Sequence, residues 1–185
     1  MSRIPLVEPA DLNAEQAEYY KNHPGGKLNI YRLLCQAPTC QPGYGQLATA
    51  IFAKLDVPPK ERELVVLVVA QLQRCAYEWA QHVQIARDMG IEQERIDAVA
   101  DERFTAPVFN ARELALIEFT RQSVENVRVD DPAFNAVAEF YSSRQIVELL
   151  FTIGSYMMLA RIMEVAELEV DAVNGAEVVR RATGS

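Results

Sequence analysis

Histidine, cysteine and tryptophan are scarce in this 185-residue sequence, which contains two, three and one of them respectively. The three cysteines, Cys35, Cys40 and Cys75, are an odd number and include no Cys-x-x-Cys pair. Neither a disulfide scaffold nor a zinc site is therefore indicated. The two histidines also lack the spacing of a paired metal ligand, so we expect no metal and no other cofactor.

Long hydrophobic runs are absent as well. The longest aliphatic run, Leu64–Ala70, is far shorter than the roughly 20 residues that cross a bilayer, so no membrane contact is expected. The first residues, Met1–Glu8, lack the apolar stretch and small-residue cleavage site of a secretory signal. These two absences predict a cytoplasmic location.

Basic residues are outnumbered, with 18 Lys and Arg against 26 Asp and Glu and a formal net charge of -8. Such a surface repels phosphate backbones, so nucleic acid is not expected as a partner. Half of the residues are hydrophobic and 24% are charged, which is the composition of a globular protein rather than a disordered or fibrous one. The length matches one domain.

Strand-like segments are nearly missing, whereas apolar residues at helical spacing recur along most of the chain. The sequence therefore predicts an all-α fold, a compact bundle of about seven or eight helices within a single domain 1–185. Prolines and glycines punctuate residues 1–45, which we interpret as an N-terminal arm wrapped around the core. Residues 46–125 form the predicted helical core, and 126–185 the C-terminal helices.

Caps and glycines predict several helix boundaries. They are Gly90 at the end of one helix, Asn110 with Glu113 as a capping box before a helix over 111–125, Asp130–Pro132 before the next, Ser142 or Ser143 before a long helix over 144–167, and a surface tail from Gly175.

The sequence also predicts a break between two helices within one long segment. The segment Lys60–Met89 contains no proline or glycine and is longer than the usual globular helix. Its first part is apolar on every face, whereas the part from residue 76 alternates polar and apolar residues. We therefore predict a break near Gln73–Cys75, which would let Glu63 approach side chains of the second helix.

The second helix contains the one polar constellation of the sequence. Cys75, Glu78 and His82 stand at positions i, i+3 and i+7, which places them within about 60° of one another on one helix face. A thiol, an acid and an imidazole in one pocket are typical of proton transfer or nucleophilic attack. A purely structural interpretation is also open, in which Cys75 is a small core residue and Glu78 and His82 form a surface pair.

The segment Cys75-Ala76-Tyr77-Glu78-Trp79-Ala80-Gln81-His82, preceded by Glu63 and followed by Ala86 and Gly90-Ile91, resembles the core motif of the carboxymuconolactone decarboxylase and alkylhydroperoxidase D superfamily. The resemblance covers about residues 45–125. The peroxidase branch of that superfamily has a Glu, eleven intervening residues, Cys-x-x-Cys, and a His four residues on. Glu63, Cys75 and His82 fit this spacing, while Glu78 stands at the position of the second Cys.

The resemblance implies an alkylhydroperoxidase D-like helical fold, a small-molecule substrate and a homo-oligomer, whether dimer, trimer or hexamer, in which the apolar run after Glu63 helps to pack subunits. Our leading hypothesis is a cofactor-independent enzyme similar to carboxymuconolactone decarboxylase. In it His82 and Glu78 exchange a proton with a small carboxylate or lactone, Glu63 orients them, and Cys75 forms a wall of the pocket or carries a proton.

Two alternatives stay open from the sequence. One is a thiol peroxidase similar to alkylhydroperoxidase D, in which Cys75 is activated by His82 and Glu63 but lacks a neighbouring resolving thiol. The other is a non-catalytic helical oligomer. A metal site built from Glu63, Glu78 and His82 is disfavoured because it contains a single imidazole.

Overall fold

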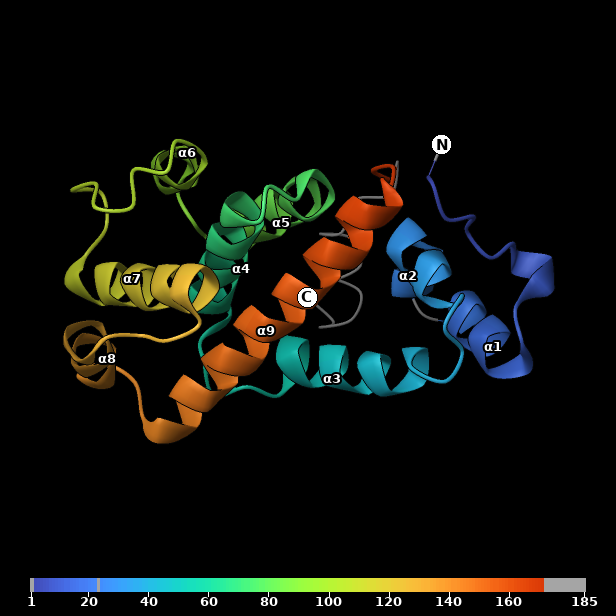
Figure 1. Ribbon diagram of the computed structural model, residues 1–185, viewed down its shortest axis with the longest axis horizontal. Coiled ribbons are helices and arrows are strands. Elements are labelled where there is room, and N and C mark those ends of the chain that lie inside the picture. The colour runs from blue at the N-terminus through green and yellow to red at the C-terminus, as the bar shows by residue number, and fades with distance from the viewer. Residues whose placement is uncertain (1, 23, 172–185) are drawn as a thin grey trace.

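The computed structural model describes residues 2–22 and 24–171, so the predicted surface tail from Gly175 lies outside the described residues. Within these ranges the chain forms nine α-helices, two 3₁₀ helices and no strand, which confirms the predicted all-α fold (Figure 1). The elements are η1 (Pro9–Asp11), α1 (Ala14–Asn22), η2 (Pro24–Lys27), α2 (Asn29–Leu34), α3 (Gln41–Ala53), α4 (Pro59–Leu72), α5 (Ala76–Asp88), α6 (Gln93–Ala100), α7 (Ala111–Asn126), α8 (Asp131–Ala138) and α9 (Ser143–Ala166).

Helix α4 is the centre of the bundle and packs against α5, α7 and α9. Its residues Leu64–Ala70 are all buried, none being more than 3% exposed, because neighbouring helices surround it on every side. A helix that is apolar all round is stable only in such a position. The expectation that this run packs against another subunit is therefore wrong, since its side chains are already covered by the same chain.

The predicted break between α4 and α5 is confirmed. Helix α4 ends at Leu72, Arg74 adopts the left-handed conformation with φ 53°, and α5 starts at Ala76. The Cys75 N–H donates to the Ala70 carbonyl at 2.9 Å and the Arg74 N–H donates to the Gln71 carbonyl at 3.0 Å. This is the Schellman pattern, which satisfies the last carbonyls of a helix while the chain turns.

Other boundaries also follow from their caps. Asn110 and Glu113 form a capping box at α7, and Ser142 and Gln145 form one at α9. Gly90 follows α5 with a positive φ of 81°, as expected of a glycine at a helix end. The start of α3 differs from the start of the helical core that the sequence predicted at residue 46. Pro42 and the glycine after it do not precede this helix but lie in its first turn, where proline is tolerated. The helix therefore begins at Gln41 rather than near residue 46.

The N-terminal arm wraps over one end of the bundle, where α1 and α2 lie near the C-terminal end of α9 and far from α6 and α8 (Figure 1). The Arg3 N–H donates to the Ala166 carbonyl at 2.7 Å. After α9 the chain returns to the arm, where the Asp171 carboxylate accepts hydrogen bonds from the Asn29 N–H, at 2.7 Å, and from the Tyr77 hydroxyl. These bonds tie α2 and α5 to the segment that follows α9.

Helix α9 is long and apolar enough to span a membrane by length and composition, but half of its most apolar window is buried inside the protein. A core helix of a soluble protein meets the same criteria, so this property alone does not indicate a membrane span. The other side of α9 is exposed. Its exposed large apolar side chains lie on one face of the helix, the α9 stripe, which consists of Val147, Leu150, Phe151, Met158 and Val165, each at least 42% exposed.

Candidate active site

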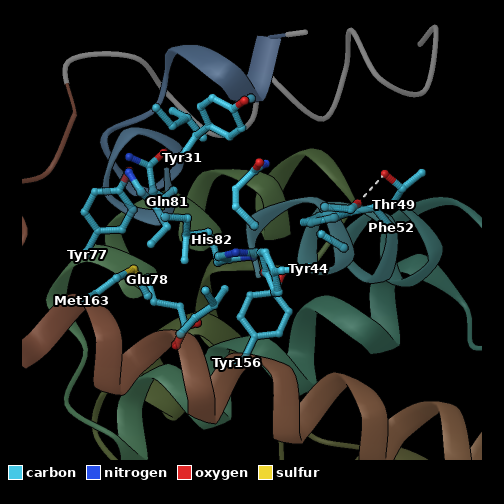
Figure 2. Close-up of a pocket in the computed structure, with 18 of the residues that line it drawn as sticks. Tyr31, Tyr44, Thr49, Phe52, Tyr77, Glu78, Gln81, His82, Tyr156 and Met163 are labelled. Carbon is cyan, nitrogen blue, oxygen red and sulfur yellow. Dashed lines mark hydrogen bonds between the residues drawn. The ribbon is translucent and has the colours of Figure 1, made fainter. Parts of the chain in front are cut away.

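A cavity of about 270 Å³ lies between the arm, α3, α5 and α9 (Figure 2). Of the four residues that the sequence singled out, Glu78 and His82 line it. In Figure 2, His82 lies between Glu78 on one side and Tyr44 and Phe52 on the other. The arm supplies one wall of this cavity, so the segment that the sequence predicted to wrap around the core also encloses the candidate site.

Glu63 and His82 meet directly. The Glu63 Oε2 and His82 Nδ1 atoms are 2.7 Å apart, although the two residues stand nineteen positions apart on different helices. The break between α4 and α5 produces this contact, as the sequence analysis predicted. Glu63 is fully buried and His82 is 7% exposed, so solvent screens the contact little. Glu63 itself lies behind His82 and is not part of the cavity wall.

The Glu63 carboxylate has a second partner, Arg62. The Arg62 Nε and Nη2 atoms donate to Glu63 Oε1 at 3.0 and 2.9 Å. Burial raises the pKa of Glu63, but His82 and Arg62 outweigh burial, and the net pKa is lowered below its usual value. Glu63 is therefore ionised in the folded protein, and its charge is compensated inside the core.

An ionised carboxylate can only accept hydrogen bonds, so the proton of the Glu63–His82 contact resides on His82 Nδ1. Nε2 is thereby the ring nitrogen that remains to accept a proton from a ligand. Aromatic side chains hold the ring in place. Phe52 stacks parallel to it with centroids 6.3 Å apart, and Tyr156 contacts it edge-on at 5.0 Å. The imidazole is thus oriented by one carboxylate and two rings.

Glu78 has the opposite environment. Its side chain is 2% exposed, and neither carboxyl oxygen has a hydrogen-bond partner among the described residues. Burial, assisted by the negative charge of Glu164, raises the pKa of Glu78 to about 9. The carboxyl is therefore protonated at neutral pH and can donate a proton. One cavity region thus combines a neutral acid with an imidazole that a second, ionised carboxylate supports.

Cys75 is not part of the cavity wall, so the expectation that it lines the pocket is wrong. It is the N-cap residue of α5 and is 1% exposed. Burial raises the pKa of the Cys75 thiol to about 12, more than the backbone hydrogen bond at residue 78 lowers it. Backbone N–H groups at a helix N-terminus favour a thiolate, but desolvation dominates here and the Cys75 thiol keeps its proton.

Sequence reasoning missed Arg62 and three aromatic residues of the site. Arg62 is 3% exposed, and its Nη1 atom donates to the Phe52 carbonyl at 2.8 Å, which fastens α4 to the end of α3. Its guanidinium also lies 5.0 Å from the centroid of the Phe52 ring. A signal for Arg62 exists in the sequence, since it directly precedes Glu63 and a run of buried residues. Tyr44 and Tyr156 carry no such signal.

Across residues 2–22 and 24–171, no group of three or more His, Cys, Asp or Glu side chains is arranged to hold a metal ion. Within that part of the chain, the carboxylate nearest to His82 is already engaged by Arg62.

Residues 38–122 match the model of the carboxymuconolactone decarboxylase family. This segment includes α3 to α6 and most of α7, and therefore contains Glu63, Glu78 and His82. None of the curated proteins matches the chain in sequence.

Solved structures of low sequence identity share the fold. An uncharacterized peroxidase-related protein from Ralstonia eutropha JMP134, an alkylhydroperoxidase AhpD core, is 18% identical over 97% of this chain and 95% of its own, with a TM-score of 0.82. A peroxidase-related protein from Silicibacter sp. TM1040 is 15% identical over 95% and 93%, with a TM-score of 0.79. The debrominase Bmp8 is 16% identical over 98% and 96%, with a TM-score of 0.74. These likenesses show an AhpD-like fold.

The raised pKa of Glu78 predicts a specific pH dependence of stability. In the unfolded chain this carboxyl ionises near its ordinary pKa of 4.5, whereas in the folded protein it keeps its proton up to about pH 9. Its contribution is therefore fully present below pH 4.5 and is lost as the pH rises toward 9. Glutamine cannot ionise, so the free energy of unfolding of Glu78→Gln should increase relative to that of the wild type by up to about 1.4 kcal/mol per pH unit across this window.

Urea unfolding at pH 5 and pH 8 measures this difference, with the exposed Glu139→Gln as the matched control. Parallel pH profiles of wild type and Glu78→Gln would mean that Glu78 is ionised in the folded protein.

The buried Arg62–Glu63 pair predicts a second, non-additive result. Glu63→Gln should lower the free energy of unfolding by about 3 to 5 kcal/mol, because it leaves the Arg62 guanidinium buried without its counter-charge. The double variant Arg62→Met with Glu63→Gln should lose less than the sum of the two single variants. Chemical denaturation of the four proteins tests this cycle, and strict additivity would show that the two charges are not coupled.

Proposed function

This chain belongs to the carboxymuconolactone decarboxylase family through residues 38–122, and on that basis we propose that it is a cofactor-independent enzyme whose His82 and Glu78 transfer protons to and from a small carboxylate or lactone. One observation carries the proposal. Glu63 contacts the His82 imidazole at 2.7 Å, Glu78 lines the same cavity as that imidazole, and the pKa values of the two buried carboxyl groups are moved in opposite directions, Glu63 downward and Glu78 upward to about 9. Such a separation of pKa values gives Glu63 the role of stabilising the base, His82, and gives Glu78 the role of the acid.

The proposed reaction begins at a carbon next to a carbonyl group. His82 Nε2 takes the proton from this carbon, and the electron pair of the C–H bond moves into the carbonyl to form an enolate. The neutral Glu78 carboxyl gives its proton to the enolate oxygen, and Glu63 stabilises the imidazolium through the Nδ1 hydrogen bond. Where the substrate carries a neutral carboxylic acid group at that carbon, His82 Nε2 takes the proton of that group instead. The C–C bond then breaks, CO₂ leaves, its electron pair forms the same enolate, and the imidazolium protonates the carbon.

A thiol peroxidase is the second candidate, favoured by the peroxidase-related proteins among the structural neighbours. The debrominase Bmp8 likewise has a structure in which a cysteine is replaced by alanine and 2,3,4-tribromopyrrole is bound. In this chain, however, the residue that faces the cavity is Glu78, while Cys75 is buried beside it with a raised pKa. We therefore rank proton transfer above peroxide reduction.

The two candidates predict opposite variant effects. With α-angelica lactone as the probe in D₂O, the wild type should catalyse deuterium exchange at the carbon next to the carbonyl, measured by NMR. His82→Gln and Glu78→Gln should each slow this exchange by about 10²- to 10⁴-fold, which is the usual contribution of a general acid or base. Cys75→Ala, as the control, should retain the wild-type rate within a small factor.

Peroxide consumption with a dithiol donor is measured on the same proteins. If wild-type protein consumes peroxide and Cys75→Ala does not, while lactone exchange is absent, the thiol mechanism replaces the proposed one. A wild type inactive in both assays would support the non-catalytic oligomer.

We also propose that a second copy of this chain covers the α9 stripe, in accordance with the homo-oligomer that the family resemblance implies. The stripe follows one face of the helix, where the exposed Arg161 stands between Met158 and Val165. Exposed apolar side chains gathered on one face are typical of subunit contacts. Gly154 lies among its residues, and a Cβ atom there would meet nothing within 4 Å in the same chain. Open space at a glycine in a helix permits close approach of another helix.

Light scattering coupled to gel filtration tests this contact. The wild type should be a dimer or larger, and Phe151→Glu should shift it to the monomer because the charge opposes burial of the stripe. Phe134→Glu is the matched control, since Phe134 is an exposed apolar residue of α8 outside the stripe. A monomeric wild type, or equal effects of both variants, would contradict the proposed contact.

A further inference from the structure

The wall of the cavity is rich in aromatic rings. Five tyrosines and one phenylalanine line it, and most of the remaining lining residues are aliphatic or small. The rings come from every element around the cavity and are Tyr19, Tyr31, Tyr44, Phe52, Tyr77 and Tyr156. Aromatic walls of this kind bind flat apolar molecules through dispersion and ring contacts.

Positive charge is missing from the wall. Among the described residues that line the cavity there is no lysine and no arginine. The contacts place one guanidinium near the site, that of Arg62. It lies against the Phe52 ring and already donates to Glu63 and to the Phe52 carbonyl. A substrate carboxylate would therefore lose its water without gaining a counter-charge from Arg62 or from the wall, which is unfavourable.

Several hydroxyl groups of the wall are already bonded within the protein. The Tyr31 hydroxyl donates to the Gln16 carbonyl at 3.1 Å, and the Thr49 hydroxyl donates to the Gly45 carbonyl at 2.9 Å. The Tyr77 hydroxyl donates to Asp171. Glu78 and His82 lie about one turn apart on α5 and both line the cavity, and the carboxyl oxygens of Glu78 have no hydrogen-bond partner among the described residues. A ligand thus needs one polar end and an apolar remainder.

We propose that the cavity binds an uncharged, predominantly apolar ring compound with a carbonyl oxygen at one end, and that it rejects the corresponding carboxylate. The carbonyl end is directed toward Glu78 and His82, and the ring lies among the aromatic side chains of the arm and α3. A neutral lactone meets this description, whereas a free carboxylate does not. The inference specifies the substrate class of the reaction proposed above and in that sense rests on it.

The size of the cavity agrees with a molecule of one or two rings. An apolar cavity of about 150 Å³ holds a benzene molecule, and the cavity here measures about 270 Å³. Two fused six-membered rings therefore fit, and a long or branched substrate would require movement of the arm.

Two probes differ in charge on the same ring system. Coumarin is a neutral aromatic lactone, and coumarin-3-carboxylate is the same bicycle with one negative charge at pH 7. Isothermal titration calorimetry on the full-length protein measures both affinities without requiring turnover. Coumarin should bind at least about tenfold more tightly than coumarin-3-carboxylate. A tenfold difference in affinity corresponds to about 1.4 kcal/mol, which is a modest part of the free energy lost when a carboxylate is desolvated without a counter-charge.

Two variant pairs locate the site and test its charge. Ala48→Trp fills the cavity from α3 and should abolish coumarin binding, whereas Gln46→Trp, at an exposed position of the same helix, should not. Leu34→Arg brings a cation into the wall and should reduce the preference for coumarin at least about tenfold. Gln36→Arg adds the same charge at an exposed position outside the wall and should leave the preference unchanged.

Each outcome has a defined meaning. Equal or tighter binding of coumarin-3-carboxylate by the wild type, no detectable binding of coumarin, or coumarin binding that persists in a folded Ala48→Trp variant would each overturn the inference. If coumarin binds as expected but His82→Gln leaves lactone exchange unchanged, the proposed reaction is wrong and the binding class stands. If exchange depends on His82 but carboxylates are preferred, the reaction stands and the binding class is wrong.

Discussion

The contact between Glu63 and its two cationic or basic partners determines the rest of this site. A fully buried carboxylate is stable only when its charge is compensated, and here Arg62 and His82 supply that compensation from α4 and α5. Because Arg62 also bonds to the Phe52 carbonyl at the end of α3, the same cluster fixes three helices relative to one another. The orientation of His82 is thus a consequence of how a buried charge is satisfied.

The chemical difference between Glu63 and Glu78 arises from their surroundings and not from their residue type. Glu63 meets two partners that favour its ionised form, while Glu78 meets apolar neighbours and the negative charge of Glu164. Ionised Glu63 fixes the proton on His82 Nδ1, and neutral Glu78 retains a proton to give. The protein therefore obtains an acid and a base from two glutamates and one histidine, with aromatic rings excluding water around them.

The position of Glu78 also bears on the difference from thiol peroxidases. In the motif that the sequence resembles, this position holds the second cysteine of the pair. Of the two positions of that pair, it is the one that lines the cavity in the present structure. Cys75, at the first position, caps the helix and is buried away from the cavity. A carboxyl group at this position can give or accept a proton but cannot form a disulfide, which agrees with the proton-transfer function that we propose.

The sequence by itself determined the all-α class, the caps at Asn110 and Ser142 and the break before Cys75, because these depend on local spacing and backbone preference. The family resemblance singled out Glu63, Cys75, Glu78 and His82, of which Glu78 and His82 line one cavity. Tertiary structure alone decided that Arg62 completes the charge cluster, that tyrosines from the arm, α3 and α9 enclose the cavity, and that the Cys75 thiol is desolvated and turned away. Burial and electrostatic compensation depend on residues distant in the chain, and no local pattern encodes them.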